Sequence, residues 1–477
     1  MRKTKIVCTI GPALDSEEML EKMINAGMNI ARINFSHGDY EEQSNRIEMI
    51  KRVRERTGKP VALMLDTKGP EIRIGKFETG EIMLNEADTF TLVSDDILGD
   101  NSKVSITYKN LANEIEVGTK ILINDGLIEC EVKEINGTDI ICNVINGGKL
   151  TNRKSINIPN SKINLPSLTE KDISDIKFGA ENGFDYIAAS FIRKPEDVIN
   201  IRNILRESNA ENIKIISKIE NREGVDNFDK ILEVSDGIMV ARGDLGVEIP
   251  MEEVPILQKE FIKKCNMAGK IVITATQMLE SMVNSPRPTR AEVSDVANAI
   301  FDETGAIMLS AESATGKYPL KCIETMNKIS ETVENYINYW KRYEQRKYNL
   351  DNFDNEYKLN YSVVTTAMEM KTKAIIAYTE TGNTARMLAS FMPKCPIFAL
   401  TSNENTYRQL ALTWGVTPIL VKDKKDPNDI ISDGIEKIKE NNYLTEGDIV
   451  VIAGGATILS NHHDEEINKT IGGILKI

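Results

Sequence analysis

Short apolar stretches recur through residues 1–310, and each is followed by a polar or glycine-rich end and then by a helical pattern. Continuous runs of Val, Ile and Leu are typical of strands buried on both faces, as in a parallel sheet. Most segments between them have the pattern of one amphipathic helix, and Asp15 or Ser16 is a suitable N-cap for the first. The pattern predicts strands at Lys5–Ile10, Asn29–Phe35, Val61–Thr67, Tyr186–Phe191, Ile213–Glu220, Gly237–Gly243, Lys270–Thr276 and Ala306–Ser310.

The alternation of these eight strands with helices favours an α/β protein built on a (β/α)8 barrel. An open, doubly wound sheet is the alternative that the same alternation allows. The chain has 477 residues, a length that suits two to four domains.

The spacing of the strands is interrupted once, between Val61 and Tyr186. The intervening segment contains short β-rich stretches separated by Asn-Gly and Asp-Gly sequences, which are typical of hairpin turns. We therefore predict a small β-barrel domain at residues 69–167, with hinges at Lys68–Pro70 and Leu165–Pro166. An insertion in a βα loop lies over the catalytic face of a barrel, so this domain is expected to act as a lid.

A third domain is predicted after the eighth strand. A helix at Lys321–Tyr343 leads into a polar stretch at 341–360, and further strands follow with helical segments between them. This arrangement is typical of a three-layer α/β domain. The predicted strands are Ala374–Tyr378, Ile397–Leu400, Thr417–Val421 and Ile449–Ala453. The expected organisation is thus a catalytic barrel at 1–68 and 168–342, the lid at 69–167, and a regulatory domain at 343–477.

The composition narrows the classes of function. Lys and Arg total 59 and Asp and Glu total 72, a net charge of −13 that argues against general nucleic-acid binding. The three histidines, His37, His462 and His463, are too few for a histidine-rich metal site, and we expect the last two in a solvated loop. The six cysteines form no CxxC pair and are interpreted as reduced core residues. Since no run of about 18 apolar residues and no secretory h-region is seen, we expect a cytoplasmic protein without a membrane partner.

Polar side chains stand at the carboxyl end of six of the predicted strands, where a barrel carries its catalytic groups. Placing so many polar groups on buried strands is costly unless they serve a function. These strand-end residues are Arg32, Asn34, Ser36 and His37; Asp66, Thr67 and Lys68; Lys218 and Glu220; Arg242, Gly243 and Asp244; Thr276 and Gln277; and Ser310 and Glu312.

Two of these carboxylates suit a divalent ion. Lys218 and Glu220 are two residues apart on a strand and point the same way, and Asp244 comes from the next strand. A sparse pair of carboxylates suits Mg²⁺ or Mn²⁺, which take their remaining ligands from water and substrate. The alternative is that Lys218–Glu220 and Arg242–Asp244 are structural ion pairs.

Further strand-end groups complete a site for phosphoryl transfer. Arg32 and Lys218 supply positive charge for an anionic group, and Gly243 allows a close approach of the backbone. Cations around a moving phosphoryl group are typical of phosphoryl transfer. Oxygen donors for a monovalent cation come from Asn34, Ser36, Asp66 and Thr67.

Several long motifs occur in one order along essentially the whole chain. The most specific is IISKIENREGV at Ile215–Val225. The others are Ile30–Asp39, Leu65–Arg73, Ser235–Val247, Thr274–Met282, Pro286–Asn298 and Ile307–Gly316. Together these motifs resemble those of the pyruvate kinase family. The resemblance implies transfer of a phosphoryl group from phosphoenolpyruvate to ADP in glycolysis, dependence on K⁺ and on Mg²⁺ or Mn²⁺, allosteric regulation, and a homotetramer.

The resemblance also implies roles for individual residues. Arg32 contacts the transferring phosphoryl group, Lys218 stabilises the enolate oxygen, and Glu220 and Asp244 hold the divalent ion. Thr276 and Ser310 resemble the hydroxyls of the family's proton-delivery network, and Glu71 resembles the K⁺-requiring branch. The implied substrate contacts are Arg32, Lys218, Gly243, Asp244 and Thr276; the K⁺ ligands are Asn34, Ser36, Asp66 and Thr67; and the nucleotide contacts are Asn34, His37, Arg73 and Lys154.

The chain departs from the family pattern at Asn124, Ser155, Asn160 and Ala311, which affects the expected behaviour of the lid rather than the reaction. In the third domain, the loop 379–386 resembles the effector loop of regulated pyruvate kinases. It offers hydroxyls and backbone N–H groups to a sugar-phosphate or nucleotide effector at Thr379, Thr381, Gly382, Asn383 and Thr384. The alternative for this loop is an ordinary capped helix start.

Two other functions fit some of the same residues. A metal-dependent barrel lyase or aldolase acting on pyruvate-like enolates would use Glu220, Asp244 and Arg32 but no nucleotide. A catalytically silent metabolite sensor would use only the loop 379–386, and the retained strand-end residues argue against it.

Overall fold

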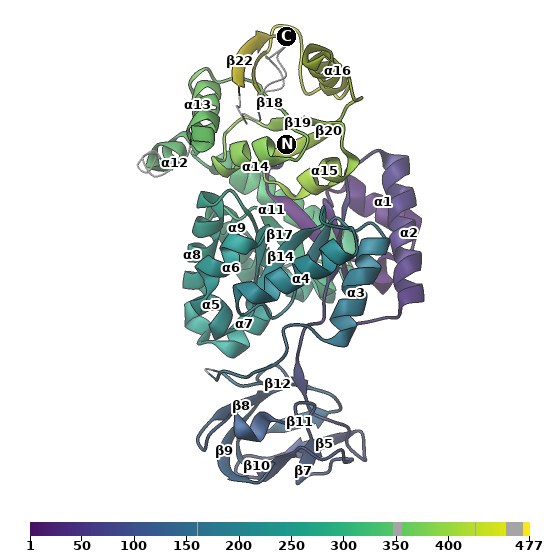
Figure 1. Ribbon diagram of the computed structural model, residues 1–477, viewed down its shortest axis with the longest axis vertical. Helices are drawn as coiled ribbons and strands as arrows, with labels where there is room; N and C mark the ends of the chain where they lie inside the picture. Colours follow the sequence, from purple (N-terminus) through teal and green to yellow (C-terminus); the bar gives the residue numbers. More distant parts are fainter. Residues whose placement is uncertain (160, 347–354, 425, 455–470) are drawn as a thin grey trace.

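The computed structural model describes residues 1–159, 161–346, 355–424, 426–454 and 471–477. Three units are stacked along the long axis of the molecule, with the barrel in the middle (Figure 1). Two predicted features, His462–His463 and Asn160, lie outside the described residues.

Eight parallel strands close into the predicted barrel, and each lies where a continuous apolar run was found. Their order around the barrel follows the chain, and β17 pairs with β1 to close it. The open-sheet alternative is therefore wrong. The strands are β1 Lys5–Thr9, β2 Ile30–Asn34, β3 Ala62–Asp66, β13 Tyr186–Ala189, β14 Lys214–Ile219, β15 Gly237–Ala241, β16 Ile271–Ala275 and β17 Ala306–Leu309.

Helices cover the outside of the barrel and bury one apolar face each against the strands. Ser16 is the N-cap of the first helix, since its side chain accepts a hydrogen bond from the N–H of Met19. These helices are α1 Glu17–Asn25, α2 Tyr40–Thr57, α3 Glu170–Glu181, α4 Pro195–Glu207, α5 Arg222–Asp226, α6 Phe228–Val234, α7 Arg242–Glu248, α8 Val254–Met267, α9 Arg290–Phe301, α10 Ala311–Ala314 and α11 Pro319–Tyr336. The next helix, α12 Tyr339–Arg346, instead packs its buried Tyr339 and Tyr343 into the apolar core of the C-terminal domain.

The helix predicted at Lys321–Tyr343 is two helices. The backbone of Ile337 is extended and ends α11. The side chain of Asn338 then accepts a hydrogen bond from the N–H of Lys341 and caps α12. The prediction missed this break because the apolar spacing continues across it.

A β domain with its own apolar core follows β3, as predicted. It contains a mixed seven-stranded sheet and a two-stranded sheet. The strands are β4 Ile72–Arg73, β5 Glu81–Leu84, β6 Thr89–Val93, β7 Lys103–Ser105, β8 Lys120–Ile123, β9 Ile128–Asn136, β10 Asp139–Asn146, β11 Gly148–Thr151 and β12 Ser155–Asn157. The domain lies at the end of the barrel opposite to the C-terminal domain (Figure 1).

Two barrel side chains hold the linkers of this lid domain. The carboxylate of Asp172 accepts a hydrogen bond from the N–H of Gly69 at 3.0 Å. The guanidinium of Arg193 donates to the carbonyl oxygens of Ile163 and Leu165 at 3.0 and 2.6 Å. Gly69 has a φ of 73°, and a Cβ there would clash with Phe191 and Ser190. Glycine is therefore required at this hinge.

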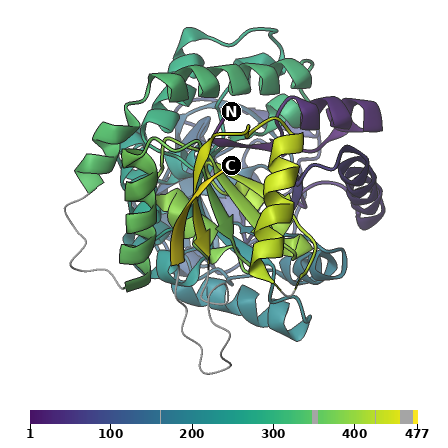
Figure 2. The same ribbon diagram turned by 90° about the horizontal axis from the view of Figure 1, so that it is seen from above.

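The C-terminal domain has a five-stranded sheet in the order β20-β19-β18-β21-β22, with helices beside it (Figure 2). All four predicted strands are present, and β22 was not predicted. The elements are α13 Asn355–Glu369, β18 Ala374–Tyr378, α14 Asn383–Ser390, β19 Ile397–Thr401, α15 Glu404–Gln409, β20 Val416–Leu420, α16 Pro427–Glu440, β21 Ile449–Gly454 and β22 Ile471–Lys476.

This domain packs on the amino-terminal ends of the barrel strands. The hydroxyl of Tyr186 donates to the carbonyl oxygen of Gln409 at 2.6 Å, and Arg408 forms an ion pair with the buried Asp185 at 2.9 Å. The ammonium of Lys5 donates to the carbonyl oxygen of Val416. The lid and the C-terminal domain therefore contact opposite ends of one barrel.

All six cysteines are buried free thiols, and each of the three units contains at least one. Burial raises the pKa of every one of them, to about 12 for Cys130, Cys142 and Cys322. They are core residues, as predicted.

Candidate active site

The carboxyl ends of the barrel strands bring two cations and one carboxylate into direct contact. The guanidinium Nε of Arg32 lies 2.6 Å from Oδ2 of Asp66, and the ammonium of Lys218 lies 3.0 Å from Oδ1 of the same side chain. Parallel pairing of β2 with β3 places Arg32 beside this carboxylate. Burial alone would raise the pKa of Asp66, but Arg32 and Lys218 outweigh it and lower that pKa. Asp66 is therefore an anion that fixes both cations.

Lys218 and Glu220 point the same way, as their spacing predicted. The ammonium of Lys218 lies 3.1 Å from Oε1 of Glu220 and donates to Oγ of Ser190 at 2.7 Å. Burial opposes the charge on Lys218, but Asp66 and Glu220 together raise its pKa. Lys218 is therefore a fixed cation that three strand ends share.

Glu220 is a buried carboxyl with an unusually high pKa. Its Oε2 accepts a hydrogen bond from the N–H of Phe191 at 2.5 Å. Burial raises its pKa to about 7, Lys218 opposes that rise, and the charge of Asp244 adds to it. The charge of Asp244 raises the pKa of both Glu220 and Lys218, so the carboxylates of Asp244 and Glu220 act on the same group of charges.

Asp244 lies in the first turn of α7, which directly follows β15. The N–H of Gly243 donates to Oγ1 of Thr276 at 2.8 Å, and Thr276 donates in turn to the carbonyl oxygen of Ala275. Arg242 anchors the start of the helix through the carbonyl oxygen of Thr276 and an ion pair with Asp295 at 2.7 Å. The structural pair Lys218–Glu220 thus exists, whereas Arg242 is bound to Asp295.

The backbone is strained where two of these strands end. Thr276 has a φ of 67° and Phe191 a φ of 54°. A β-branched residue rarely adopts such a conformation, and strain of this kind clusters at functional sites. At Thr276, the strained conformation accompanies the hydrogen bond that its hydroxyl accepts from Gly243.

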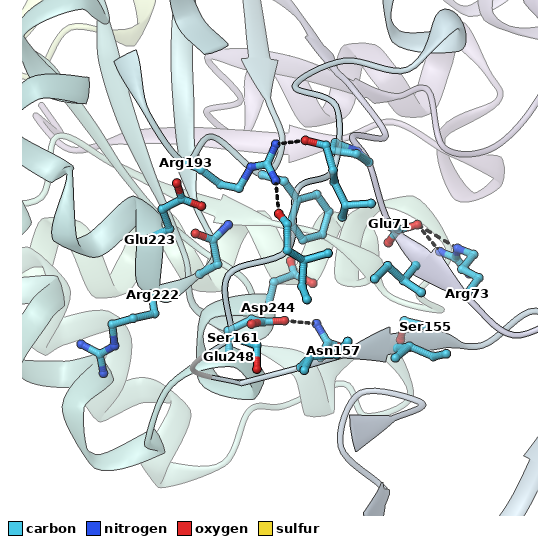
Figure 3. Close-up of a pocket in the computed structure, with 18 of the residues that line it drawn as sticks. Glu71, Arg73, Ser155, Asn157, Ser161, Arg193, Arg222, Glu223, Asp244 and Glu248 are labelled. Carbon is cyan, nitrogen blue, oxygen red and sulfur yellow. Dashed lines mark hydrogen bonds and ion pairs between the residues drawn. The ribbon is translucent and has the colours of Figure 1, made fainter. Parts of the chain in front are cut away.

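A cleft of about 220 Å³ lies between the lid and the barrel (Figure 3). The barrel contributes Asp244 and Glu248 from α7, and the lid contributes Arg73, Lys154 and Asp125. The guanidinium of Arg73 forms an ion pair with Glu71 at 2.6 Å. The side-chain amide of Asn157 in β12 donates to Oε1 of Glu248 at 2.7 Å, which joins the lid directly to α7.

None of the described residues at the end of β2, Asn34 and His37 included, lines that cleft. Oδ1 of Asn34 accepts a hydrogen bond from the N–H of Ser36, and the side chain of His37 is exposed. The hydroxyl of Thr67 accepts from the N–H of Ser190 at 3.1 Å.

Ser310 has a buried hydroxyl for which the described residues provide no hydrogen-bond partner. Its backbone N–H donates to Oε2 of Glu312, and Oε1 of the same fully buried carboxyl accepts from the N–H of Leu279. Glu312 therefore fixes the loop that presents the Ser310 hydroxyl.

In the C-terminal domain, the loop between β18 and α14 is held by its own side chains. The hydroxyl of Thr379 accepts a hydrogen bond from the N–H of Gly382 at 2.9 Å. The guanidinium of Arg386 donates to the carbonyl oxygen of Thr381 and to Oδ1 of Asn383 at 2.8 and 2.7 Å. Gly382 has a φ of 83° at the N-cap of α14.

Sequence reasoning missed two partners of the central cations. Ser190 binds Lys218, and Thr9 accepts a hydrogen bond from Arg32 at 2.7 Å. Both are hydroxyl residues at the ends of β13 and β1, two strands that contributed no predicted site residue. Applying the strand-end rule to all eight strands would have found them.

No group of three or more His, Cys, Asp or Glu side chains within the described ranges is arranged to hold a metal ion. A divalent site at Glu220 and Asp244 would therefore consist of two carboxylates. In the described part of the chain, no helix is long and apolar enough to cross a membrane.

The fold and the site define a three-domain barrel enzyme with fixed cations at its catalytic end, and comparison with known proteins assigns the family. Residues 1–323 match the family described as the barrel domain of pyruvate kinase, and residues 358–464 match its alpha/beta domain. The pyruvate kinase of Clostridium acetobutylicum is 51% identical over 456 residues, 95% of this chain and 96% of its own.

Two further relatives agree. The pyruvate kinase of Clostridium perfringens is 51% identical over 95% of this chain and 96% of its own. That of Staphylococcus haemolyticus is 50% identical over 95% of this chain and 78% of its own. The chain belongs to the pyruvate kinase family and is a phosphotransferase. These comparisons do not favour the lyase or aldolase alternative.

Proposed function

We propose that this chain transfers the phosphoryl group of phosphoenolpyruvate to ADP, giving pyruvate and ATP, at the carboxyl end of the barrel. The main evidence for this site is the array of ion pairs that joins Arg32, Asp66, Lys218 and Glu220. Both substrates are anions that repel each other in water, so a site for them needs cations already in place. Asp66 holds two such cations in fixed positions.

Arg32 and Lys218 have separate tasks in this proposal. Arg32 contacts the transferring phosphoryl group, and a guanidinium suits several phosphate oxygens at once. Lys218 stabilises the negative charge on the enolate oxygen of the departing pyruvate. Its raised pKa keeps it charged throughout, so it acts as an electrostatic group and not as a proton donor.

Glu220 and Asp244 fit a divalent ion, Mg²⁺ or Mn²⁺. The fit is supported by the pKa of Glu220, which burial and the neighbouring charge of Asp244 raise to about 7, because a cation would relieve both effects. A bound ion would neutralise charge on phosphoenolpyruvate. Gly243 and Thr276 would line the substrate carboxylate, and their mutual hydrogen bond fixes the start of α7.

The donors proposed for K⁺ are Asn34, Ser36, Asp66 and Thr67. They are neutral oxygens and one carboxylate, a set that suits a weakly held monovalent ion. The register of β2 and β3 pairs Asn34 with Asp66, which supports a common site. A bound K⁺ would add positive charge beside the phosphoryl group.

The nucleotide is proposed to lie in the cleft under the lid. Arg73 and Lys154 both line that cleft and carry the charges that ADP phosphates require. Asn34 and His37 remain proposed contacts from the side of β2. Lid closure over the cleft would exclude water and strengthen these electrostatic contacts.

Thr276 and Ser310 are proposed to belong to the relay that delivers a proton to the enolate carbon. The buried, unpartnered hydroxyl of Ser310 supports this role, because such a group is costly unless a water or substrate satisfies it. A hydroxyl relay also agrees with the presence of only three histidines.

Regulation and assembly are proposed from the family. The loop at Thr379, Thr381, Gly382, Asn383 and Thr384 would bind a sugar-phosphate or nucleotide effector, and the chain would form a cytoplasmic homotetramer. Ile256 and Phe301, on neighbouring helices α8 and α9, are 66% and 39% exposed and offer apolar surface for self-association.

A coupled assay for pyruvate tests the proposal. Pyruvate should form only with phosphoenolpyruvate, ADP, Mg²⁺ and K⁺ together, and ATP should appear in equal amount. Pyruvate production without ADP would instead support a lyase.

A further inference from the structure

A crevice separates the amino-terminal end of the barrel from helix α14 of the C-terminal domain, far from the catalytic end. Its larger part has a volume of about 420 Å³ and is bounded by segments that precede β14, β15 and β16. A smaller apolar slot of about 30 Å³ adjoins it, and both parts share Gly269, Lys270 and Arg386. In the ribbon, α14 lies between the C-terminal sheet and the barrel (Figure 1).

The larger part is lined by four cations from four segments of two domains. They are Arg202, Lys214, Lys270 and Arg386, and the carboxylates beside them are Glu233, Asp236 and Glu356. The crevice thus has a net charge of about +1 in a chain whose net charge is −13. A local positive field of this kind attracts small anions.

Only one of these carboxylates forms ion pairs with the cations. Asp236 accepts from Arg202 at 3.1 Å, and the ammonium of Lys214 lies 3.6 Å from its other oxygen. Lys270 donates to the backbone carbonyl oxygens of Leu232 and Glu233 instead. Arg202 and Lys214 therefore share one counter-ion, and Lys270 has only backbone partners.

Arg386, like Lys270, has no carboxylate partner among the ion pairs of the described residues. Its guanidinium donates to the carbonyl oxygen of Thr381 and to Oδ1 of Asn383 in its own loop. Burial lowers its pKa, whereas the more distant charge of Asp236 acts in the opposite direction. A partly buried guanidinium without a paired carboxylate leaves positive charge that a bound anion would neutralise.

A second, independent feature lies in the apolar slot. The hydroxyl of Thr413 is buried, with its residue 5% exposed, and the described residues offer it no hydrogen-bond partner. Trp414, Leu412 and Met392 form the apolar wall around it. An orphaned buried hydroxyl next to an open crevice marks a place for a ligand atom or a bound water.

We propose that this crevice binds a small metabolite with an oxyanion group, phosphate or carboxylate. The oxyanion would lie between Arg386, Arg202 and Lys214, and a group no larger than a methyl would reach the slot beside Thr413 and Trp414. The crevice adjoins the loop 379–384, because Asn383 of that loop and Arg386 both line it.

The position of the crevice links it to the catalytic end. Lys214 begins β14, the strand that leads to Lys218 and Glu220. Asp236 precedes β15, and Lys270 precedes β16, which lead to Asp244 and Thr276. An occupant would therefore contact the near ends of the strands whose far ends form the proposed active site.

Titration with inorganic phosphate, and separately with isobutyrate, tests the binding site without substrates, so the result does not depend on the proposed function. Trp340→Phe leaves Trp414 as the one tryptophan, and its fluorescence reports on the slot. Saturable binding should weaken at least about tenfold in Lys214→Gln and in Arg202→Gln. It should persist in Lys22→Gln, an exposed ion-pair control on α1, and in Thr384→Val.

Equal affinity in all four variants, or no saturable signal with either anion, would overturn the site. Whichever of the two anions, phosphate or isobutyrate, gives saturable binding identifies the oxyanion group of the metabolite. Because Lys214 pairs only loosely with Asp236, Lys214→Gln is the variant expected to keep the wild-type melting temperature. The link between this crevice and turnover rests on the proposed function. The anion that binds should change the phosphoenolpyruvate concentration that gives half-maximal rate in the wild type, and should not change it in Lys214→Gln. If this concentration does not change in the wild type, the link to turnover is refuted, whereas the binding site is not.

Discussion

Replacement of Lys218 by methionine tests the central claim about the active site. The ammonium lies within 3.1 Å of Asp66, Glu220 and Ser190, so methionine removes three polar contacts while keeping a similar volume. Arg32 still neutralises Asp66. Glu220 loses its close cation, but its high pKa allows it to bind a proton instead.

Two different magnitudes follow from this geometry. Loss of one preorganised electrostatic group lowers kcat by about 10²–10³, which corresponds to about 3–4 kcal/mol. Breaking a buried ion pair costs about 3–5 kcal/mol of stability, and the remaining Arg32–Asp66 pair places Lys218→Met at or below the low end of that range. Activity should therefore fall much more than the folded fraction.

The assay is steady-state pyruvate formation, with urea unfolding and Mn²⁺ binding measured on the same samples. Lys22→Met, which removes an exposed i,i+4 pair on α1, is the control and should keep full activity. Folded Lys218→Met that binds Mn²⁺ and retains turnover within tenfold of the wild type would refute the role of this ammonium.

Three other perturbations test the remaining parts of the site. Exchange of K⁺ for tetramethylammonium should abolish turnover, and an unchanged rate would reject the site at Asp66 and its neighbours. Without metal, burial and Asp244 raise the pKa of Glu220 from 4.5 to about 7, so its contribution to stability is complete below pH 4.5 and is lost as the pH rises through 7. Urea unfolding in chelator at pH 5 and pH 7 should show this loss, up to about 1.4 kcal/mol per pH unit, in the wild type and not in Glu220→Gln. Asn157→Ala removes the 2.7 Å hydrogen bond between the lid and α7, and it should raise the KM for ADP about fivefold with kcat nearly unchanged. Equal KM values in the variant and the wild type would contradict a role of this hydrogen bond in holding the lid closed.

The barrel was predictable because its strands are buried on both faces. Runs such as Gly237–Ala241 are apolar at nearly every position, and so short an apolar run between helical segments is typical of a strand inside a parallel sheet. By contrast, β22 contains Gly472 and Gly473, and its described side chains are mostly exposed, so its sequence carries little strand signal. Its place in the sheet depends on pairing with β21.

The site was predictable in its residue types but not in its contacts. The rule that catalytic groups gather at strand ends identified Arg32, Asp66 and Lys218. It could not show that one carboxylate holds both cations, because that contact depends on side chains from strands far apart in sequence. The same limitation hid the pairing of Arg242 with Asp295, which shares no motif with it.

The buried thiols allow the local unfolding of each of the three units to be measured separately by chemical modification. Cys130 and Cys142 lie in the lid, Cys395 in the C-terminal domain, and Cys8, Cys265 and Cys322 in the barrel. An alkylating reagent can modify each of them only when its surroundings unfold, since a thiol with a raised pKa and no solvent contact is inert. Peptide mapping of the alkylated cysteines over time would therefore rank the three units by how often each one opens.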